Sequence, residues 1–233
     1  MTRRRWMADE VADSRAALTG AHANHLSRVL RAEIGQEFDI GTGTEVRRGV
    51  IVRIQPDRVE FELGELVSTS PAARLTLMLS IFKFDRMEWA IEKCTELGVS
   101  RIAPVIASRT DSHLATASMK RVERWRRIAR EAAQQSRQMA PPEIAEPAKL
   151  KDMISQNPGI RIVLSESERG MMLRDVRLSG DETAFAIGPE GGWTEPELKM
   201  FRNAAWVSVS LGSMILRAET AAIVATAVLL SLL

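Results

Sequence analysis

Two loops near the C-terminus contain the residues of this chain whose types and spacing most suggest chemistry. The first, residues 187–192, reads Ile-Gly-Pro-Glu-Gly-Gly, and the second spans residues 211–221. Each loop follows a segment typical of a β-strand, Thr183–Ile187 or Trp206–Leu211, and precedes a segment typical of a helix. Open α/β sheets bind their ligands at the carboxyl ends of their strands. The two loops therefore predict a ligand site at the carboxyl ends of neighbouring strands.

The glycines of the first loop indicate a close approach between backbone and ligand. Gly188, Gly191 and Gly192 permit a positive φ and place no Cβ in the way of a ligand. The loop lacks the lysine of a Walker A sequence and does not read G-x-G-x-x-G. Because Glu190 would repel a polyphosphate, the loop favours a ligand whose reactive end is cationic or neutral. For the glycines alone, an ordinary tight connection between strand and helix remains the alternative.

The second loop combines an apolar stretch with two charged residues. Met214–Leu216 is too short to form a helix of its own, and beside a glycine loop it would make a slot for a flat ring such as adenine. We expect Arg217 to be largely buried at the rim of this slot, where it would supply positive charge to a substrate group. The alternative is that Arg217 only pairs with Glu219 at the start of the following helix.

The elements that must position these loops fall into two regions. Residues 36–66 alternate between apolar and polar in the manner of short strands, at Glu37–Ile40, Glu45–Ile54 and Arg58–Leu63, which predicts a small barrel. Residues 68–73 are typical of a linker. From Arg74 on, strands and helices alternate, which predicts an α/β domain with a parallel sheet. Further strands are expected at Arg74–Phe82, Arg101–Ile106 and Ile160–Ser165, and helices at Asp85–Leu97, Ser118–Gln138, Thr194–Asn203 and Ala218–Leu233.

Composition excludes several classes of protein. The 233 residues are 45% apolar and 27% charged, as is ordinary for a globular protein. The single cysteine, Cys94, excludes an internal disulfide and a cysteine zinc site, and we expect it to be inert in the core. The three histidines lack the spacing of metal ligands, so no metal is expected. The N-terminus lacks an apolar stretch typical of a signal peptide, and the apolar residues 221–233 are too few to span a bilayer, which predicts a cytoplasmic protein.

The charge distribution favours a nucleic acid as partner. Basic residues exceed acidic ones by only two (32 against 30), yet the sequence pI is about 9.0. The basic residues gather in clusters at residues 3–5, 28–31, 47–48 and 121–127. Each cluster alone is typical of a solvated surface, whereas several together favour contacts with phosphates.

The two loops, with further segments in the same order, resemble the signature of the ribosomal RNA small-subunit methyltransferase E family, which lies within the SPOUT class of knotted methyltransferases. The segments that carry the resemblance outside the loops are Asn24–Arg31, Lys83, Glu92–Pro104 and Glu123–Ile144. Two positions depart from the family pattern. Gln138 stands where an arginine is common. Trp193 stands where a smaller apolar residue or phenylalanine is usual, and we expect tryptophan to be tolerated because the position only requires apolar bulk.

The resemblance implies a fold that sequence periodicity would not predict. It implies a PUA-like β-barrel that binds RNA over residues 1–70 and a SPOUT methyltransferase domain over residues 71–233, with a trefoil knot over about 160–233. Sequence pattern alone predicts an unknotted chain, since threaded topologies are rare. The resemblance also implies a homodimer in which each site is completed by the partner chain.

The resemblance further implies an activity, which is methyl transfer from S-adenosylmethionine to N3 of a uridine in 16S ribosomal RNA. Arg217 is the first candidate to stabilise the developing imidate, and Glu190 or Glu219 would accept the proton. The cofactor would lie against Leu164, Ser165, Ile187, Gly188, Gly191, Gly192, Leu211, Gly212, Met214, Ile215 and Leu216. Contacts with RNA are expected from Arg3, Arg4, Arg5, His25, Arg28, Arg31 and Lys83.

Two other classes of function stay open at this point. One is an RNA-binding ribosome-assembly factor whose cofactor pocket is vestigial. The other is a nucleotide-dependent enzyme that uses the glycine loop for phosphate, against which the absent lysine and Glu190 count.

Overall fold

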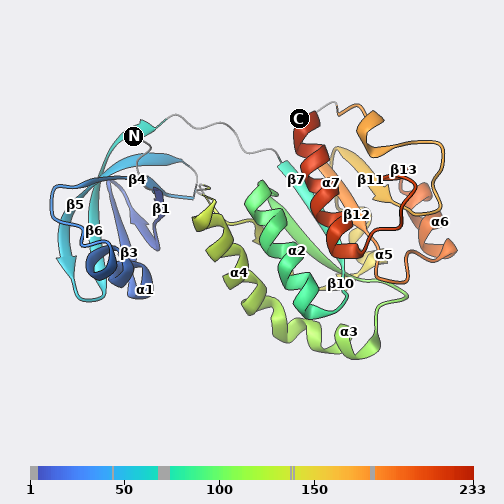
Figure 1. The fold of residues 1–233 in the computed structure, drawn as a ribbon, viewed down its shortest axis with the longest axis horizontal. Coiled ribbons are helices and arrows are strands. Elements are labelled where there is room, and N and C mark those ends of the chain that lie inside the picture. Colours follow the sequence, from blue (N-terminus) through green and yellow to red (C-terminus); the bar gives the residue numbers. More distant parts are fainter. Residues whose placement is uncertain (1–4, 44, 68–73, 137, 139, 179–181) are drawn as a thin grey trace. The chain divides into compact units, whose positions relative to one another are not determined.

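The computed structural model describes residues 5–43, 45–67, 74–136, 138, 140–178 and 182–233. The chain forms two compact units (Figure 1). The first comprises residues 1–71 together with residues 133–141, and the second comprises residues 72–132 and 142–233. The predicted linker at residues 68–73 lies outside the described residues.

The first unit is a curled six-stranded sheet with strand order β1-β4-β5-β6-β3-β2. The predicted strands are confirmed as β4 (Glu37–Gly41), β5 (Val46–Gln55) and β6 (Arg58–Val67), which pair antiparallel in succession. The predicted barrel is a sheet whose outermost strands, β1 and β2, are not neighbours in the described part of the chain.

Several short elements of the first unit were not predicted from the sequence. They are β1 (Arg5–Met7), β2 (Glu10–Ala12), β3 (Arg15–Thr19), the helix α1 (Gly20–Asn24) and a π-helical turn, η1 (His25–Val29). Three to five residues are too few to show a period of 2 or 3.6. Leu18, Leu26, Ile40 and Phe61 are fully buried inside the curl of the sheet and form the centre of this core.

The second unit is an α/β layer structure built on a parallel sheet. The main strand order is β10-β8-β7-β12-β11-β13, β9 pairs with β8, and every strand pair is parallel. All carboxyl ends of the described strands therefore lie along one edge. The strands are β7 (Arg74–Ser80), β8 (Arg101–Ile106), β9 (Glu143–Ile144), β10 (Ala148–Lys149), β11 (Ile160–Leu164), β12 (Glu182–Ile187) and β13 (Val207–Val209).

Helices cover both faces of this sheet, and each face has its own core. One face packs against α2 (Phe84–Leu97), α4 (Val122–Gln135) and α7 (Ala218–Leu232), and Figure 1 shows α2 and α7 side by side. The other face packs against α5 (Leu150–Met153) and α6 (Glu195–Asn203). The alternation along β12 shows this division, since Phe185 and Ile187 lie in the first core and Ala184 and Ala186 in the second.

The helices differ from the sequence prediction chiefly in one place. The helix expected over Ser118–Gln138 is found as α4, which begins only after a 3-10 turn, η2 (Met119–Arg121), and the unpredicted helix α3 (Ser112–Ser118) precedes that turn. A further 3-10 turn, η3 (Leu173–Asp175), lies between β11 and β12. The α/β class with a parallel sheet is confirmed. None of the described helices is both long and apolar enough to cross a membrane.

Cys94 lies in the first of these cores, as the sequence predicts. Its side chain is fully buried, and burial raises the pKa of its thiol to about 12, while the Thr226 hydroxyl, 3.3 Å from Sγ, acts in the opposite direction. At neutral pH the thiol is therefore protonated and unreactive.

Candidate active site

The candidate site lies where three adjacent strands end. Leu164 at the end of β11 pairs with Val209 of β13, and Val163 pairs with Ala186 of β12, so β11 lies between the two strands whose loops the sequence singled out. The expectation that those two strands are neighbours is wrong. The consequence is a third loop, residues 165–170, between the glycine loop and the apolar loop.

The glycine loop is a turn with one position that requires glycine. Gly192 has a φ of +69°, and its N–H donates to the Pro189 carbonyl at 2.8 Å. A Cβ at this position would lie 3.0 Å from a carboxylate oxygen of Glu166 in the neighbouring loop. Gly188 and Gly191 do not adopt a positive φ, and a Cβ there would meet Trp193 and Arg109 instead. The backbone therefore packs closely, although only Gly192 uses the left-handed region.

Trp193 does more than supply apolar bulk. Its indole N–H donates to the Leu164 carbonyl at 3.1 Å, and its ring packs edge-on against Phe201 with 4.9 Å between centroids. The side chain is buried. This hydrogen bond ties the glycine loop to the end of β11, and a phenylalanine at this position could not make it.

Glu197 fixes the other end of the glycine loop. Thr194 and Glu197 form a capping box at the start of α6, with the Glu197 carboxylate accepting from the Thr194 N–H at 2.8 Å. The second carboxylate oxygen accepts from the Ser108 N–H at 2.7 Å, which joins the loop after β8 to the glycine loop. Burial acts to raise the pKa of Glu197, but the hydrogen bonds from Ser108 and Thr194 outweigh it and lower the pKa below its usual value.

Arg109 also holds the glycine loop, and sequence reasoning missed it. The side chain comes from the loop after β8, packs over Gly191 and donates to the Gly191 carbonyl. No local motif surrounds Arg109, and the two residues are 82 positions apart. Only the position of Arg109 in the loop that follows a predicted strand could have indicated it.

Arg86 of α2 lies between the two candidate proton acceptors. Its Nη1 donates to Glu190 Oε1 at 2.8 Å, and its Nε lies 3.8 Å from Glu219 Oε1. The side chain of Glu219 is only 5% exposed, and its Oε2 has no hydrogen-bond partner among the described residues. The structure thus brings Glu190 and Glu219 together around an arginine that the sequence analysis did not single out.

Arg217 differs from its expected environment. It is exposed rather than buried, at the residue that precedes α7. The described part of the chain offers its guanidinium no ion pair, and Glu219 faces Arg86 instead of Arg217. The alternative in which Arg217 and Glu219 only pair with each other is therefore wrong. The helix points Glu219 inward, while the residue before the helix remains in solvent.

The apolar loop presents its side chains to solvent. Ser210 braces its start by donating to the Gly212 carbonyl at 3.0 Å and accepting from the Gly212 N–H at 3.2 Å. Met214 and Ile215 are 78% and 83% exposed. Leu164 and Ser165, by contrast, are buried at the end of β11. The cofactor residues proposed from sequence therefore combine a buried strand end with an exposed apolar loop.

The residues expected to contact RNA are distributed over both units. Lys83 is exposed directly before α2, after the carboxyl end of β7. In the first unit His25, Arg28 and Arg31 are exposed on and beside η1, and Arg5 lies in β1. Arg3 and Arg4 lie outside the described residues.

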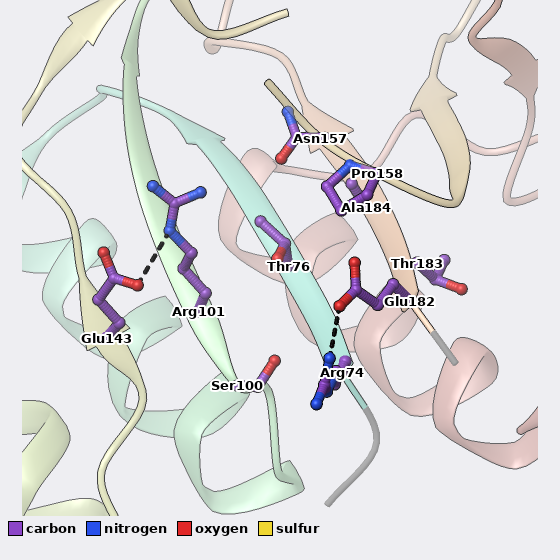
Figure 2. A pocket seen from close by; sticks show the side chains of 10 residues that line it. All are labelled: Arg74, Thr76, Ser100, Arg101, Glu143, Asn157, Pro158, Glu182, Thr183 and Ala184. Atoms are coloured by element: carbon purple, nitrogen blue, oxygen red, sulfur yellow. Dashed lines mark hydrogen bonds and ion pairs between the residues drawn. The ribbon is translucent and has the colours of Figure 1, made fainter. Parts of the chain in front are cut away.

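A pocket opens at the opposite edge of the parallel sheet, where the strands begin. Figure 2 shows that its side chains come from the amino-terminal ends of β7, β8, β9 and β12 and from the segment before β11. Both of its arginines are paired, Arg74 with Glu182 at 2.7 Å and Arg101 with Glu143 at 3.3 Å. Ligands of open α/β sheets bind at the other edge, so this pocket is separate from the candidate site.

The geometry defines an α/β enzyme with a loop-built site, and comparison with known proteins defines its class. Residues 68–230 match the model of the RNA methyltransferase domain family. The ribosomal RNA small subunit methyltransferase E of Aquifex aeolicus is 31% identical over 88% of this chain and 89% of its own, and that of Synechocystis sp. is 31% identical over 97% and 76%.

A solved structure agrees with these relatives. The ribosomal RNA small subunit methyltransferase E of Neisseria gonorrhoeae, bound to S-adenosylmethionine, superposes with a TM-score of 0.86 at 28% identity and covers 99% of this chain and 98% of its own. The chain belongs to the ribosomal RNA small subunit methyltransferase E family. Within the described residues, no group of three or more His, Cys, Asp or Glu side chains could hold a metal ion.

The hydrogen bonds of Glu197 predict a pH-dependent contribution to stability. Because folding lowers the pKa of Glu197, the stabilisation is complete above its unfolded pKa of about 4.3 and is lost as the pH falls through the lower folded value. Glu197→Gln should lower the free energy of unfolding by about 2 kcal/mol at pH 7. The difference from the unsubstituted protein should shrink below about pH 4.

Chemical denaturation at a series of pH values measures this difference. Glu195→Gln, an exposed residue of the same helix, is the control and should change stability little at any pH. A difference that grows on acidification would contradict the assignment.

Proposed function

We propose that this protein transfers the methyl group of S-adenosylmethionine to N3 of a uridine in 16S ribosomal RNA. The observation that carries the proposal is the meeting of three loops at the ends of β11, β12 and β13, with two carboxylates beside them and with Arg217, which has no ion pair within the described part of the chain. Membership of the family supports the reaction class, and the Neisseria gonorrhoeae relative binds S-adenosylmethionine.

The site suits this cofactor in its shape and its polar groups. The close-packed glycine turn has no side chain at Gly188, Gly191 and Gly192, and the apolar loop offers Met214 and Ile215 to an aromatic ring. Beside this cofactor surface, the buried Glu219 Oε2 has no donor among the described residues, and an N–H of the target base would provide one. We assign cofactor contacts to the strand ends and loops at Leu164–Ser165, Ile187–Gly192 and Leu211–Leu216.

The chemistry requires an acceptor for a proton and stabilisation of a developing negative charge. S-adenosylmethionine supplies a methyl group whose bond to sulfur breaks as its bond to N3 forms. N3 of uracil is a weakly acidic imide, so its lone pair becomes available only as the proton leaves. We assign to Arg217, which is exposed and free of an ion pair among the described residues, the stabilisation of the charge that develops on O2 or O4. Glu190 or Glu219 would accept the proton.

RNA recognition is assigned to both regions of the chain. We propose that residues 1–70 form an RNA-binding domain whose Arg5, His25, Arg28 and Arg31 contact phosphates, and that Lys83 adds a contact from the methyltransferase domain at residues 71–233. The target base must leave its stack to reach the site. We further propose that residues 160–233 form the trefoil knot, and that the enzyme acts as a homodimer in the cytoplasm, where ribosomal subunits are assembled.

Methyl transfer to defined RNA tests the proposal. The purified protein is incubated with labelled S-adenosylmethionine and either protein-free 16S ribosomal RNA or small subunits that lack the modification, and the product nucleoside is identified by mass spectrometry. N3-methyluridine is the expected product. Calorimetric titration should show binding of S-adenosylmethionine and not of ATP. Binding of ATP alone would instead support the nucleotide-dependent alternative.

The glycine turn gives a prediction about cofactor affinity. Gly192→Val should weaken S-adenosylmethionine binding at least about tenfold, because a branched side chain at φ +69° would meet Glu166 and displace the turn. Gly98→Val is the matched control, since Gly98 ends α2 at φ +111° with nothing within 4 Å of a Cβ. The control should lose stability and keep its affinity, as calorimetry can show. Equal affinities in the two variants would contradict the placement of the turn in the site.

Arg217 gives a prediction that separates turnover from binding. Arg217→Ala should lower kcat about 100-fold, because it removes charge stabilisation at the reacting base, and should leave the calorimetric affinity for the cofactor nearly unchanged. Arg202→Ala on α6 removes a different exposed arginine and should do neither. Equal losses of kcat and affinity would move Arg217 from the reaction to binding or folding.

A further inference from the structure

The proposed function leaves two carboxylates as alternatives for the proton acceptor, and their surroundings differ sharply. The side chain of Glu190 is 43% exposed, and its Oε1 already accepts a 2.8 Å hydrogen bond from Arg86. The side chain of Glu219 is 5% exposed, and its nearest cation, Arg86 Nε, lies 3.8 Å from Oε1, beyond hydrogen-bond distance. One carboxylate is thus solvated and engaged, whereas the other is buried and incompletely satisfied.

The free oxygen of Glu219 is the unusual group. Buried acceptors in native proteins almost always have a donor, and leaving one without a partner is unfavourable. Glu219 Oε2 has none among the residues that the structure describes. It lies in the first turn of α7, directly after the apolar loop and beside the glycine loop. A ligand that enters between these loops and carries an N–H group would satisfy it.

We infer that Glu219 Oε2, and not Glu190, accepts the N3 proton of the target uridine, and that Arg86 is the positioning residue that holds Glu219 for this step. The inference rests on the proposed function. The N3–H bond breaks, its proton passes to Oε2, and its electron pair stays on N3. That pair forms the bond to the methyl group as the pair of the carbon–sulfur bond leaves with sulfur. Protonated Glu219 then returns its proton to solvent.

Arg86 can hold Glu219 because it is itself held. It belongs to α2, its Nη1 is fixed by Glu190 in the glycine loop, and its Nε faces Glu219 at the start of α7. One guanidinium therefore joins α2 to the glycine loop and to the start of α7. Its two partners, Glu190 and Glu219, lie 104 or more positions further along the chain. Its positive charge offsets the cost of burying the Glu219 carboxylate, and it occupies the side of Oε1 while leaving Oε2 free.

Single-turnover methylation compares the two carboxylates directly. Glu219→Gln should lower the rate of methyl transfer about 100-fold or more, whereas Glu190→Gln should lower it less than about tenfold. Calorimetric affinity for S-adenosylhomocysteine should change little in either variant. A larger loss of rate in Glu190→Gln than in Glu219→Gln would overturn the assignment.

A substrate with a more acidic N3 tests the proton transfer itself. Fluorine at C5 of uracil withdraws electrons, so N3 loses its proton with less help from a base. The 16S ribosomal RNA is transcribed with 5-fluorouridine in place of uridine. It is supplied either protein-free or assembled into small subunits, whichever of the two the unsubstituted enzyme methylates. The rate loss in Glu219→Gln should fall from about 100-fold to about tenfold on this substrate. An undiminished loss would mean that Glu219 is structural.

Conservative and non-conservative changes test Arg86. Arg86→Lys keeps a cation beside Glu219 and should retain more activity than Arg86→Gln. The rate loss in Arg86→Gln should also diminish on 5-fluorouridine RNA, since Arg86 acts through the base. Arg202→Gln on α6 is the matched control and should behave as the unsubstituted enzyme. Equal losses in Arg86→Lys and Arg86→Gln, with no recovery on the fluorinated RNA, would overturn the positioning role.

The failure of this inference can be distinguished from failure of the proposed function. If the unsubstituted protein forms no N3-methyluridine in any RNA, the proposed function fails and the inference fails with it. If the unsubstituted protein forms that product and Glu219→Gln retains full rate, only the inference fails.

Discussion

The candidate site depends on the parallel pairing of β11 with both β12 and β13. This pairing makes three strands end side by side, with Leu164, Ile187 and Val209 along one edge of the sheet. A parallel sheet covered on both faces is held by two hydrophobic cores, so the strand ends have little freedom to shift. The loops that follow can therefore be irregular while their starting points remain fixed.

Side-chain hydrogen bonds to backbone then fix the glycine loop on this frame. Trp193 reaches Leu164 at the end of β11, Arg109 reaches Gly191, and Glu197 reaches Ser108 after β8. The first bond joins the segment after β12 to the end of β11, and the other two join it to the loop after β8, so the turn is held on two sides without a ligand. A cofactor that binds such a loop loses less free energy to ordering it than one that must fold it on arrival.

Local sequence patterns predicted what depends on neighbours in sequence and missed what depends on neighbours in space. The strands β4–β8 and the burial of Cys94 follow from periodicity and local chemistry. Arg86 gave no such signal, because its partners Glu190 and Glu219 lie more than 100 residues away. The prediction that Arg217 is buried was wrong. Arg217 precedes α7, so the helical period, which turns Glu219 toward the core, does not determine where Arg217 points.

The charge balance at the site changes one argument drawn from sequence. Glu190 was expected to repel a polyphosphate, yet Arg86 largely offsets its charge, so the absent lysine is the stronger reason against a nucleoside triphosphate. Arg86 cannot balance two carboxylates, and one net negative charge remains with the buried Glu219. A buried negative charge attracts a cation or a departing proton. Under the proposed function, alkylation at N3 by a sulfonium compound would present both, so the residual charge would serve the reaction.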